Sequence, residues 1–224
     1  FTVGNQMTEH VMKHKKINKA EAWKLAIEML GKVGIPNPEQ RMKQYPHEFS
    51  GGMRQRVMIA MALVTNPKLI IADEPTTALD VTIQAQILEL LKKIRDEFNT
   101  SIILITHDLG VVADMCDRVY VMYGGKVVEE GSCNDIFYSG NHPYAWGLLR
   151  SVPNPMADMK GKLKPIDGQP PDLISPPKGC PFYARCDYAM KVCDMYMPEM
   201  TQISATQRTA CWMLHELAKT KKED

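Results

Sequence analysis

Two features that would place a protein in a membrane are missing from this sequence. No apolar run approaches the roughly 20 residues that a helix needs to cross a bilayer, and the first residues lack a signal-peptide pattern. An excess of charge of one sign is also missing, because 27 lysines and arginines face 26 aspartates and glutamates, a net charge of +1. This balance gives no argument for binding nucleic acid or acidic substrates. With 45% hydrophobic and 24% charged residues, the 224 residues have the composition of one or two globular domains.

A further absence concerns phosphate binding. The pattern G-x-x-x-x-G-K-[ST], whose backbone amides and lysine hold the phosphates of a nucleotide, occurs nowhere in the sequence. The Gly-Lys pairs at Gly31, Gly125 and Gly161 each lack a glycine five positions before their own. The sequence also begins with Phe1 rather than methionine. We therefore expect an excised or processed piece, a split-gene product or a degenerate fragment.

Among the features that are present, the most informative is the stretch Phe49-Ser-Gly-Gly-Met-Arg-Gln-Arg56. A Ser-Gly-Gly turn exposes backbone N–H groups and a hydroxyl at the start of a helix, where the helix dipole also favours an anion. The turn is therefore suited to contact a phosphate. Its plain alternative is an ordinary turn in which Ser50 caps a helix that continues through Val64.

Two apolar segments without alternation, Lys68–Asp73 and Ser101–Thr106, predict short buried strands of a parallel sheet. The first delivers Asp73 and Glu74 to its C-terminal end, and the second is followed by His107. In an open α/β sheet ligands bind at the C-terminal ends of the strands, so a magnesium nucleotide would meet Asp73 and Glu74 there. Structural alternatives remain for both residues: Glu74 as a charge near a helix N-terminus, and His107 as a hydrogen-bonded residue at a strand end.

The other predicted elements follow from periodicity and turn residues. Residues 9–33 have apolar positions at helical spacing and end at Gly34-Ile-Pro36, and a helix is expected from Val81 to Phe98. Strands at Arg118–Met122 and Lys126–Glu130 form a predicted hairpin around two glycines. Together these elements predict an α/β fold in which helices flank a mostly parallel sheet with an antiparallel addition.

Four motifs in this order resemble those of ABC-transporter ATPases. Phe49 to Met53 resembles the family signature, with Phe for the usual Leu and Met53 for the usual Gln. Leu69 to Glu74 resembles the Walker B strand with its following glutamate, Thr77-Ala-Leu-Asp80 the D-loop, and Ile105-Thr-His-Asp108 the switch histidine. The resemblance implies the C-terminal part of an ABC ATPase nucleotide-binding domain, in which residues 1–65 are a helical subdomain, with ATP and Mg²⁺ as cofactors.

The resemblance also implies a role for each polar residue of these motifs. Asp73 would bind Mg²⁺ through a water, since a hard cation prefers carboxylate oxygen and keeps much of its hydration. Glu74 would orient and deprotonate the attacking water, and His107 would contact the γ-phosphate. The nucleotide site would be shared across a dimer. Five residues of this chain would complete the site of the opposite subunit: Ser50, Gly51, Gly52, Met53 and Asp80. Asp80 would also be the N-cap of the helix that follows it.

From residue 141 the composition changes. The segment His142-Pro-Tyr-Ala-Trp-Gly-Leu-Leu-Arg-Ser-Val-Pro153 resembles the extension found in ABC ATPases of oligopeptide and dipeptide importers, although related systems carry nickel and other small solutes. A proline cluster then predicts an extended linker; its members are Pro165, Pro170, Pro171, Pro176 and Pro177. We therefore predict two parts, an incomplete nucleotide-binding domain over 1–140 and an importer-type extension over 141–224.

The extension holds four of the six cysteines, Cys180, Cys186, Cys193 and Cys211. Their irregular spacing departs from the C-x₂-C clusters of common zinc sites and bacterial ferredoxins. By resemblance to the peptide-importer tail they hold a [4Fe–4S] cluster, with structural zinc as the alternative. The four cysteines could instead form two disulfides, in any of three pairings, but a reducing cytoplasm disfavours disulfides. The remaining pair, Cys116 and Cys133, is predicted to be buried structural thiols.

Three functions compete on this sequence. The first is the ATP-binding and hydrolysing subunit of a peptide-type importer, which would be cytoplasmic and peripheral on the inner face of the cell membrane. Its partners would be a second ATPase subunit, integral membrane permease subunits and, indirectly, a solute-binding protein, but no nucleic acid. The second is a non-transport ABC ATPase that acts on nucleic acid or ribosomes. The third is a catalytically silent interaction fragment with a metal-bearing tail, and we expect the chain alone to be inactive.

Overall fold

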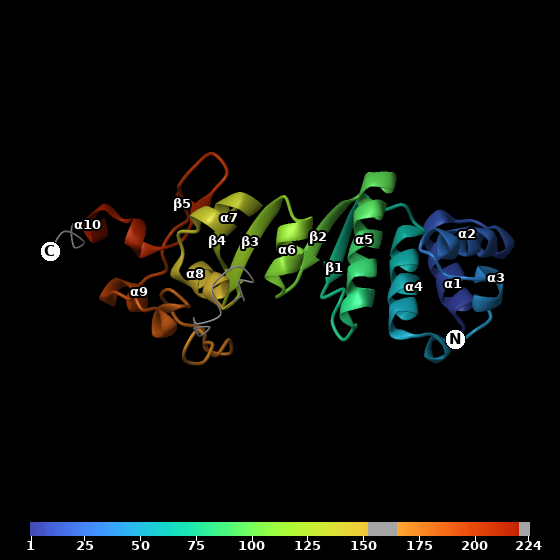
Figure 1. Cartoon of the computed structure of the whole chain (residues 1–224), viewed down its shortest axis with the longest axis horizontal. Helices are drawn as coiled ribbons and strands as arrows, with labels where there is room; N and C mark the ends of the chain where they lie inside the picture. The colour runs from blue at the N-terminus through green and yellow to red at the C-terminus, as the bar shows by residue number, and fades with distance from the viewer. Residues whose placement is uncertain (152–164, 220–224) are drawn as a thin grey trace. The chain divides into compact units, whose positions relative to one another are not determined.

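The computed structural model describes residues 1–151 and 165–219, which form two compact units, Phe1–His107 and Asp108–Asp224 (Figure 1). The division predicted at residue 140 lies inside the second unit, because the sheet of that unit takes strands from both sides of this residue. No helix in the described ranges combines the length and apolar character needed to cross a membrane.

The first unit is mainly helical, and its helices begin at polar caps. Thr2, Asn18, Ser50 and Asp80 each accept a backbone N–H in the first turn of the helix that follows. The elements are α1 Val3–Lys15, α2 Lys19–Lys32, α3 Pro38–Arg41, the 3-10 turn η1 Pro46–Glu48, α4 Gly51–Leu63, β1 Leu69–Asp73, α5 Val81–Phe98 and β2 Ser101–Ile105. The predicted helices after Ser50 and Asp80 are confirmed to within one residue.

The helical pattern predicted over residues 9–33 is divided between two helices. Lys16 adopts a left-handed conformation with φ 53°, which ends α1, and the Asn18 side chain then caps α2. Met7 and Val11 of α1 and Ala26 and Leu30 of α2 are completely buried. The apolar periodicity therefore identified the packed faces, whereas the break depends on two polar residues between them.

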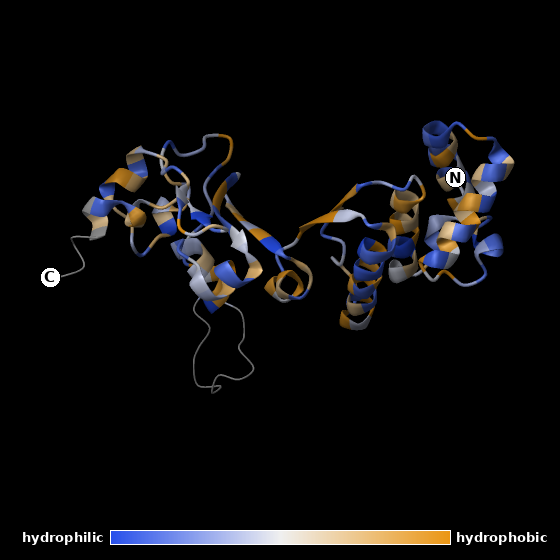
Figure 2. Cartoon of the chain, turned by 90° about the horizontal axis from the view of Figure 1, so that it is seen from above, coloured by the Kyte–Doolittle hydropathy of each residue, from blue (hydrophilic) through white to orange (hydrophobic). Residues whose placement is uncertain are grey.

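Strands β1 and β2 pair in parallel, with Leu69 opposite Ser101 and Asp73 opposite Ile105. The parallel pairing is confirmed. The prediction that both strands are buried is wrong in the part of the chain that the structure describes. Ile71 is 63% exposed and Ile103 is 48% exposed, because in that part the sheet has two strands only. Figure 2, in which hydrophobic residues are orange, shows that apolar character along this pair of strands.

The second unit is built on an antiparallel sheet with the strand order β3-β4-β6-β5. The predicted hairpin is confirmed, since Gly124 and Gly125 join β3 and β4 with φ angles of 55° and 73°. Strands β5 and β6 come from the tail and were not predicted. The elements are α6 Leu109–Met115, β3 Arg118–Tyr123, β4 Lys126–Ser132, α7 Cys133–Ser139, α8 Pro143–Arg150, η2 Tyr183–Arg185, α9 Lys191–Met195, β5 Thr201–Gln202, β6 Arg208–Thr209, η3 Trp212–Leu214 and α10 Glu216–Lys219.

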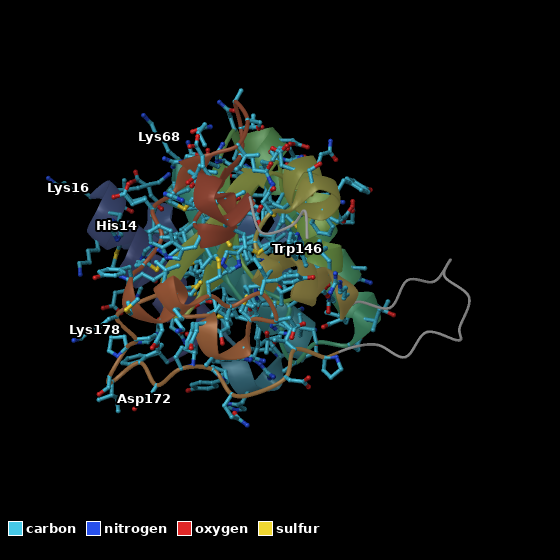
Figure 3. All side chains as sticks on the ribbon, turned by 90° about the vertical axis from the view of Figure 1, so that its left-hand side faces the viewer. His14, Lys16, Lys68, Trp146, Asp172 and Lys178 are labelled. Carbon is cyan, nitrogen blue, oxygen red and sulfur yellow. The ribbon has the colours of Figure 1, made fainter. Side chains whose placement is uncertain are left out.

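Residues 165–180 contain no helix or strand, in agreement with the predicted extended linker. Asp172 and Lys178 of this segment, labelled in Figure 3, are exposed. Arg185 holds the start of the segment, because its guanidinium donates to the carbonyls of Ile166 and Asp167 at 2.7 and 2.8 Å and to the Tyr123 hydroxyl at 3.1 Å. One side chain thus ties the linker to β3.

A buried carboxylate connects the tail to the rest of this unit. Glu129 of β4 is completely buried and accepts the backbone N–H groups of Asn141 and His142 at 2.6 and 3.0 Å. Its Oε1 also accepts from the Gln207 amide and the Thr209 hydroxyl, both at 3.1 Å. Four donors from two distant segments therefore converge on one side chain, as the burial of a charge requires.

We expect Glu129→Gln to destabilise the protein, because an amide nitrogen would replace one acceptor and leave buried donors unpaired. The expected loss in the free energy of unfolding is about 1–3 kcal/mol, measured by urea denaturation followed by circular dichroism. Glu199→Gln is the matched control, since Glu199 is exposed. An equal loss in both variants would contradict the role of the network.

Candidate functional site

The carboxyl ends of β1 and β2 bring together three of the predicted site residues. Asp73 is the last residue of β1, and the backbone N–H of Glu74 donates to the carbonyl of Ile105 at 2.9 Å, which continues the pairing beyond the strand. The His107 ring follows β2, and its Nδ1 lies 2.8 Å from Glu74 Oε1. The structure therefore places Asp73, Glu74 and His107 at one edge of the two-stranded sheet.

The Glu74 carboxylate is held by two neighbours. His107 Nδ1–H donates to Oε1 and the Thr77 hydroxyl donates to Oε2, at 2.8 and 2.7 Å. These two hydrogen bonds, the one from His107 first, lower the pKa of Glu74 below its usual range. The group is therefore ionised at neutral pH and able to accept a proton. Thr77 was not singled out from the sequence, although its place three residues after Glu74 is the spacing of a local side-chain contact.

The backbone at Glu74 is unusual for a residue with a side chain, with a φ of 48°. A left-handed conformation at a non-glycine residue costs of order 1–3 kcal/mol and persists only where surrounding contacts hold it. Here the bond to Ile105 and the turn bond from Thr77 N–H to the Glu74 carbonyl, at 3.1 Å, provide those contacts. The turn directs the chain sharply away from β1 at the carboxylate.

The Ser50 turn packs on the start of α5. Ser50 Oγ accepts from Met53 N–H at 3.3 Å, and Asp80 Oδ1 accepts from Ile83 N–H at 3.0 Å. A Cβ on Gly52 would lie 2.6 Å from Ile83 Cγ2, so only glycine permits this approach. Both Ser50 and Asp80 are exposed helix caps, which confirms the structural interpretation of these two residues.

The four tail cysteines line a single pocket in the second unit. Cys180, Cys186, Cys193 and Cys211 surround about 320 Å³ not filled by protein atoms, part of it open to solvent. The Cys180 N–H donates to the Cys193 carbonyl at 2.7 Å, and a Cβ on Gly179 would overlap that carbonyl. Glycine at 179 therefore permits the close approach of two cysteine-bearing loops. All six cysteines are free thiols.

Burial is the main influence on the acid–base chemistry of three of these thiols. It raises the pKa of Cys186 and of Cys211 to about 11, and it also raises the pKa of Cys180. A metal that binds here must displace protons, because the thiolate is the ligand. Cys116 and Cys133 lie outside the pocket and are half-buried rather than buried as predicted.

The arrangement of the thiols bears on the kind of metal centre that they suit. Among residues 1–151 and 165–219, no group of three or more His, Cys, Asp or Glu is placed to hold a single metal ion. Zinc requires four ligands at about 2.0–2.3 Å from one point, which the structure does not provide. The four thiols that line the pocket are the type of ligand that iron–sulfur clusters take.

Comparisons with known proteins agree with the motifs. Residues 2–77 match the ABC transporter family model, and residues 128–193 match the model of the oligopeptide/dipeptide transporter C-terminal region. The chain is 58% identical over 219 residues to the dipeptide transport ATP-binding protein DppD of Bacillus subtilis, covering 97% of this chain and 65% of that protein. It is 54% identical over 210 residues to the oligopeptide transport ATP-binding protein OppD of Escherichia coli, covering 94% and 62%. The chain thus spans less than two thirds of the length of these relatives.

Solved structures give the same fold. An ATP-binding cassette determined as a dimer in a post-hydrolysis state with ADP and phosphate is 31% identical, with a TM-score of 0.51 over 59% of this chain and 57% of that chain. CbiO1 from Clostridium perfringens, part of an ABC transporter complex, is 32% identical, with a TM-score of 0.53 over 62% and 54%. The predicted fold, part of an ABC ATPase nucleotide-binding domain, is confirmed. The chain belongs to the ABC transporter ATP-binding proteins, within the group that carries the oligopeptide/dipeptide transporter C-terminal region.

Proposed function

We propose that the chain is part of the ATP-hydrolysing subunit of a peptide importer. The observation that carries this proposal is the contact between Glu74 and His107 at the paired ends of β1 and β2, next to Asp73. A charged carboxylate at a strand end, held by two donors, has the form of a positioned general base. The importer class rests on the relatives, which are named as dipeptide and oligopeptide transport proteins.

Each residue of the edge has a distinct part in this proposal. Glu74 accepts a proton from the attacking water, and the bond from His107 fixes the carboxylate orientation while the ring contacts the γ-phosphate. The exposed carboxylate of Asp73 suits Mg²⁺, which takes carboxylate oxygen together with water and phosphate oxygens. When bound, the ion would neutralise charge on the phosphates.

The Ser50 turn and Asp80 serve the nucleotide of a second ATPase subunit in this proposal. Ser50 and Asp80 are exposed, and Gly51 and Gly52 bring the turn onto the start of α5, so one surface carries both motifs. The proposed partners are a second ATPase subunit, membrane permease subunits and, indirectly, a solute-binding protein. The chain would then act in the cytoplasm, on the inner face of the membrane, without contact to nucleic acid.

We expect Glu74→Gln to lower ATP turnover about 10²–10⁴-fold, the usual contribution of a positioned base, while ATP binding is retained. The measurement is phosphate release and nucleotide binding by the full-length subunit in its transporter. Glu97→Gln is the control, because Glu97 is an exposed residue of α5 that pairs with Lys93 at 3.6 Å, away from the strand ends. Turnover equal to that of the parent would overturn the assignment of Glu74.

Residues 1–224 by themselves are proposed to hydrolyse no ATP, because their sequence contains no phosphate-loop pattern. We expect calorimetry to detect no tight binding of Mg-ATP to this chain alone, measured with the parent and with Glu74→Gln so that hydrolysis does not disturb the signal. Adding the segment of a relative that carries the phosphate loop is expected to restore binding. Tight stoichiometric binding to the chain alone would refute this expectation.

The cysteine pocket is proposed to hold a [4Fe–4S] cluster. Four thiols of irregular spacing line one pocket. Thiolates are the ligands that such clusters take, and the cluster would supply electron transfer or structural cross-linking. The role of the chain is to hold the thiols close before any metal binds, through Gly179 and the bond between Cys180 and Cys193.

Anaerobically purified protein is expected to be brown and to contain iron and acid-labile sulfide. Cys186→Ser should lose most of the iron, because one thiolate ligand is removed, whereas Cys133→Ser should keep it, because Cys133 lies outside the pocket. Iron analysis and visible absorption measure both results. Colourless protein with one equivalent of zinc would contradict the cluster.

A further inference from the structure

The wall of the cysteine pocket includes one polar side chain that the proposed function does not use. His142 lines the pocket together with the four cysteines, and the residue is only 1% exposed. It is the N-cap of α8, one position before Pro143. A buried histidine at the wall of a thiol pocket needs an account of both of its ring nitrogens.

One ring nitrogen is assigned by geometry. The backbone N–H of Tyr144 donates to His142 Nδ1 at 3.1 Å. A nitrogen that accepts a hydrogen bond carries no proton, so the neutral ring has its proton on Nε2. His142 therefore presents an N–H donor at the far side of the ring from α8.

That donor has no partner among the described residues, where the side-chain hydrogen bond of His142 is the one at Nδ1. Among the described residues, every side-chain nitrogen or oxygen that is fully enclosed has a hydrogen-bond partner. Nε2 must therefore touch open space, and the pocket that His142 lines is that of the four cysteines. An unused N–H at a buried site costs free energy unless an occupant accepts it.

The backbone that carries the ring is held from outside the pocket. Glu129 Oε2 accepts the His142 backbone N–H at 3.0 Å, and the Trp146 indole donates to the Gly140 carbonyl at 2.6 Å (Trp146 is labelled in Figure 3). The bond from Tyr144 N–H to Nδ1 and the contact with the Phe182 ring, whose centroid lies 6.0 Å away, hold the imidazole in this orientation. The donor is thus preorganised toward the pocket.

We propose that His142 donates a hydrogen bond from Nε2 to a sulfur atom of the iron–sulfur cluster, a sulfide or a cysteine thiolate. The inference rests on the cluster proposed above and deepens it. Reduction adds negative charge to the cluster, and a hydrogen bond to sulfur stabilises the reduced form more than the oxidised form. His142 is therefore a residue that tunes the reduction potential rather than a metal ligand.

The test is His142→Asn in the anaerobically purified chain. Asparagine is a preferred N-cap whose Oδ1 replaces Nδ1 as the acceptor for Tyr144, but it places no donor where Nε2 stood. His215→Asn is the matched control, because His215 is an exposed tail residue outside the pocket. Redox titration should give a more negative potential for His142→Asn and an unchanged one for His215→Asn.

A second measurement does not depend on the variant retaining its cluster. With ¹⁵N-labelled histidine, pulsed electron paramagnetic resonance of the reduced parent and of His215→Asn should show a weak coupling between the cluster spin and one histidine nitrogen. Absence of that coupling, or an unchanged potential in His142→Asn, would overturn the inference. If the parent chain contains no iron and sulfide, the proposed cluster itself is overturned. Metal analysis distinguishes this outcome from a failure of the His142 inference alone.

Discussion

The buried carboxylate of Glu129 is the constraint on which the second unit depends. A charge that is completely enclosed must be matched by donors, and here the donors come from the α7–α8 connection, from β6 and from Gln207 just before it. The requirement to satisfy one side chain therefore fixes the positions of two segments that are far apart in the sequence. Those segments carry His142 and lead to Cys211, so the walls of the cysteine pocket depend on the same interaction.

In the first unit, the main constraint is that polar groups are held at the edge of a small parallel sheet. Pairing of β1 with β2 sets Asp73 opposite Ile105, and the bond from Glu74 N–H to that carbonyl extends the register into the turn. The left-handed backbone of Glu74 then turns its side chain to meet Thr77 and His107. Strain at one residue is thus the means by which three polar groups converge.

Sequence reasoning succeeded where the signal was local. The caps at Ser50 and Asp80, the glycine hairpin and the strand-end carboxylates each follow from residues close together in the chain, and each was found. The contact between Glu74 and His107 was not predicted, although each residue was assigned to the end of its strand. The sequence alone did not predict the exact hydrogen bonds, since these depend on the turn conformation at Glu74.

Sequence reasoning failed where distant residues decide the structure. Strands β5 and β6 have two residues each, too few for a periodic pattern, and β6 is held by its pairing with β4 and by the bonds of Gln207 and Thr209 to Glu129. The exposure of Ile71 depends on the number of strands in the sheet rather than on the apolar character of β1. His142 was noted only as part of a family segment, because its burial and its unused N–H are visible in three dimensions alone.

The long sequence separation of the Glu129 bonds has a consequence for biosynthesis. Gln207 and Thr209 follow Glu129 by 78 and 80 residues, so these contacts close a long loop and raise the contact order of the unit. While the ribosome is still adding the tail, β4 is an edge strand on that side of the sheet and its carboxylate has only local donors. The second unit therefore reaches its final form late in translation, and the tail residues act as the closing step of its folding rather than as an appendage.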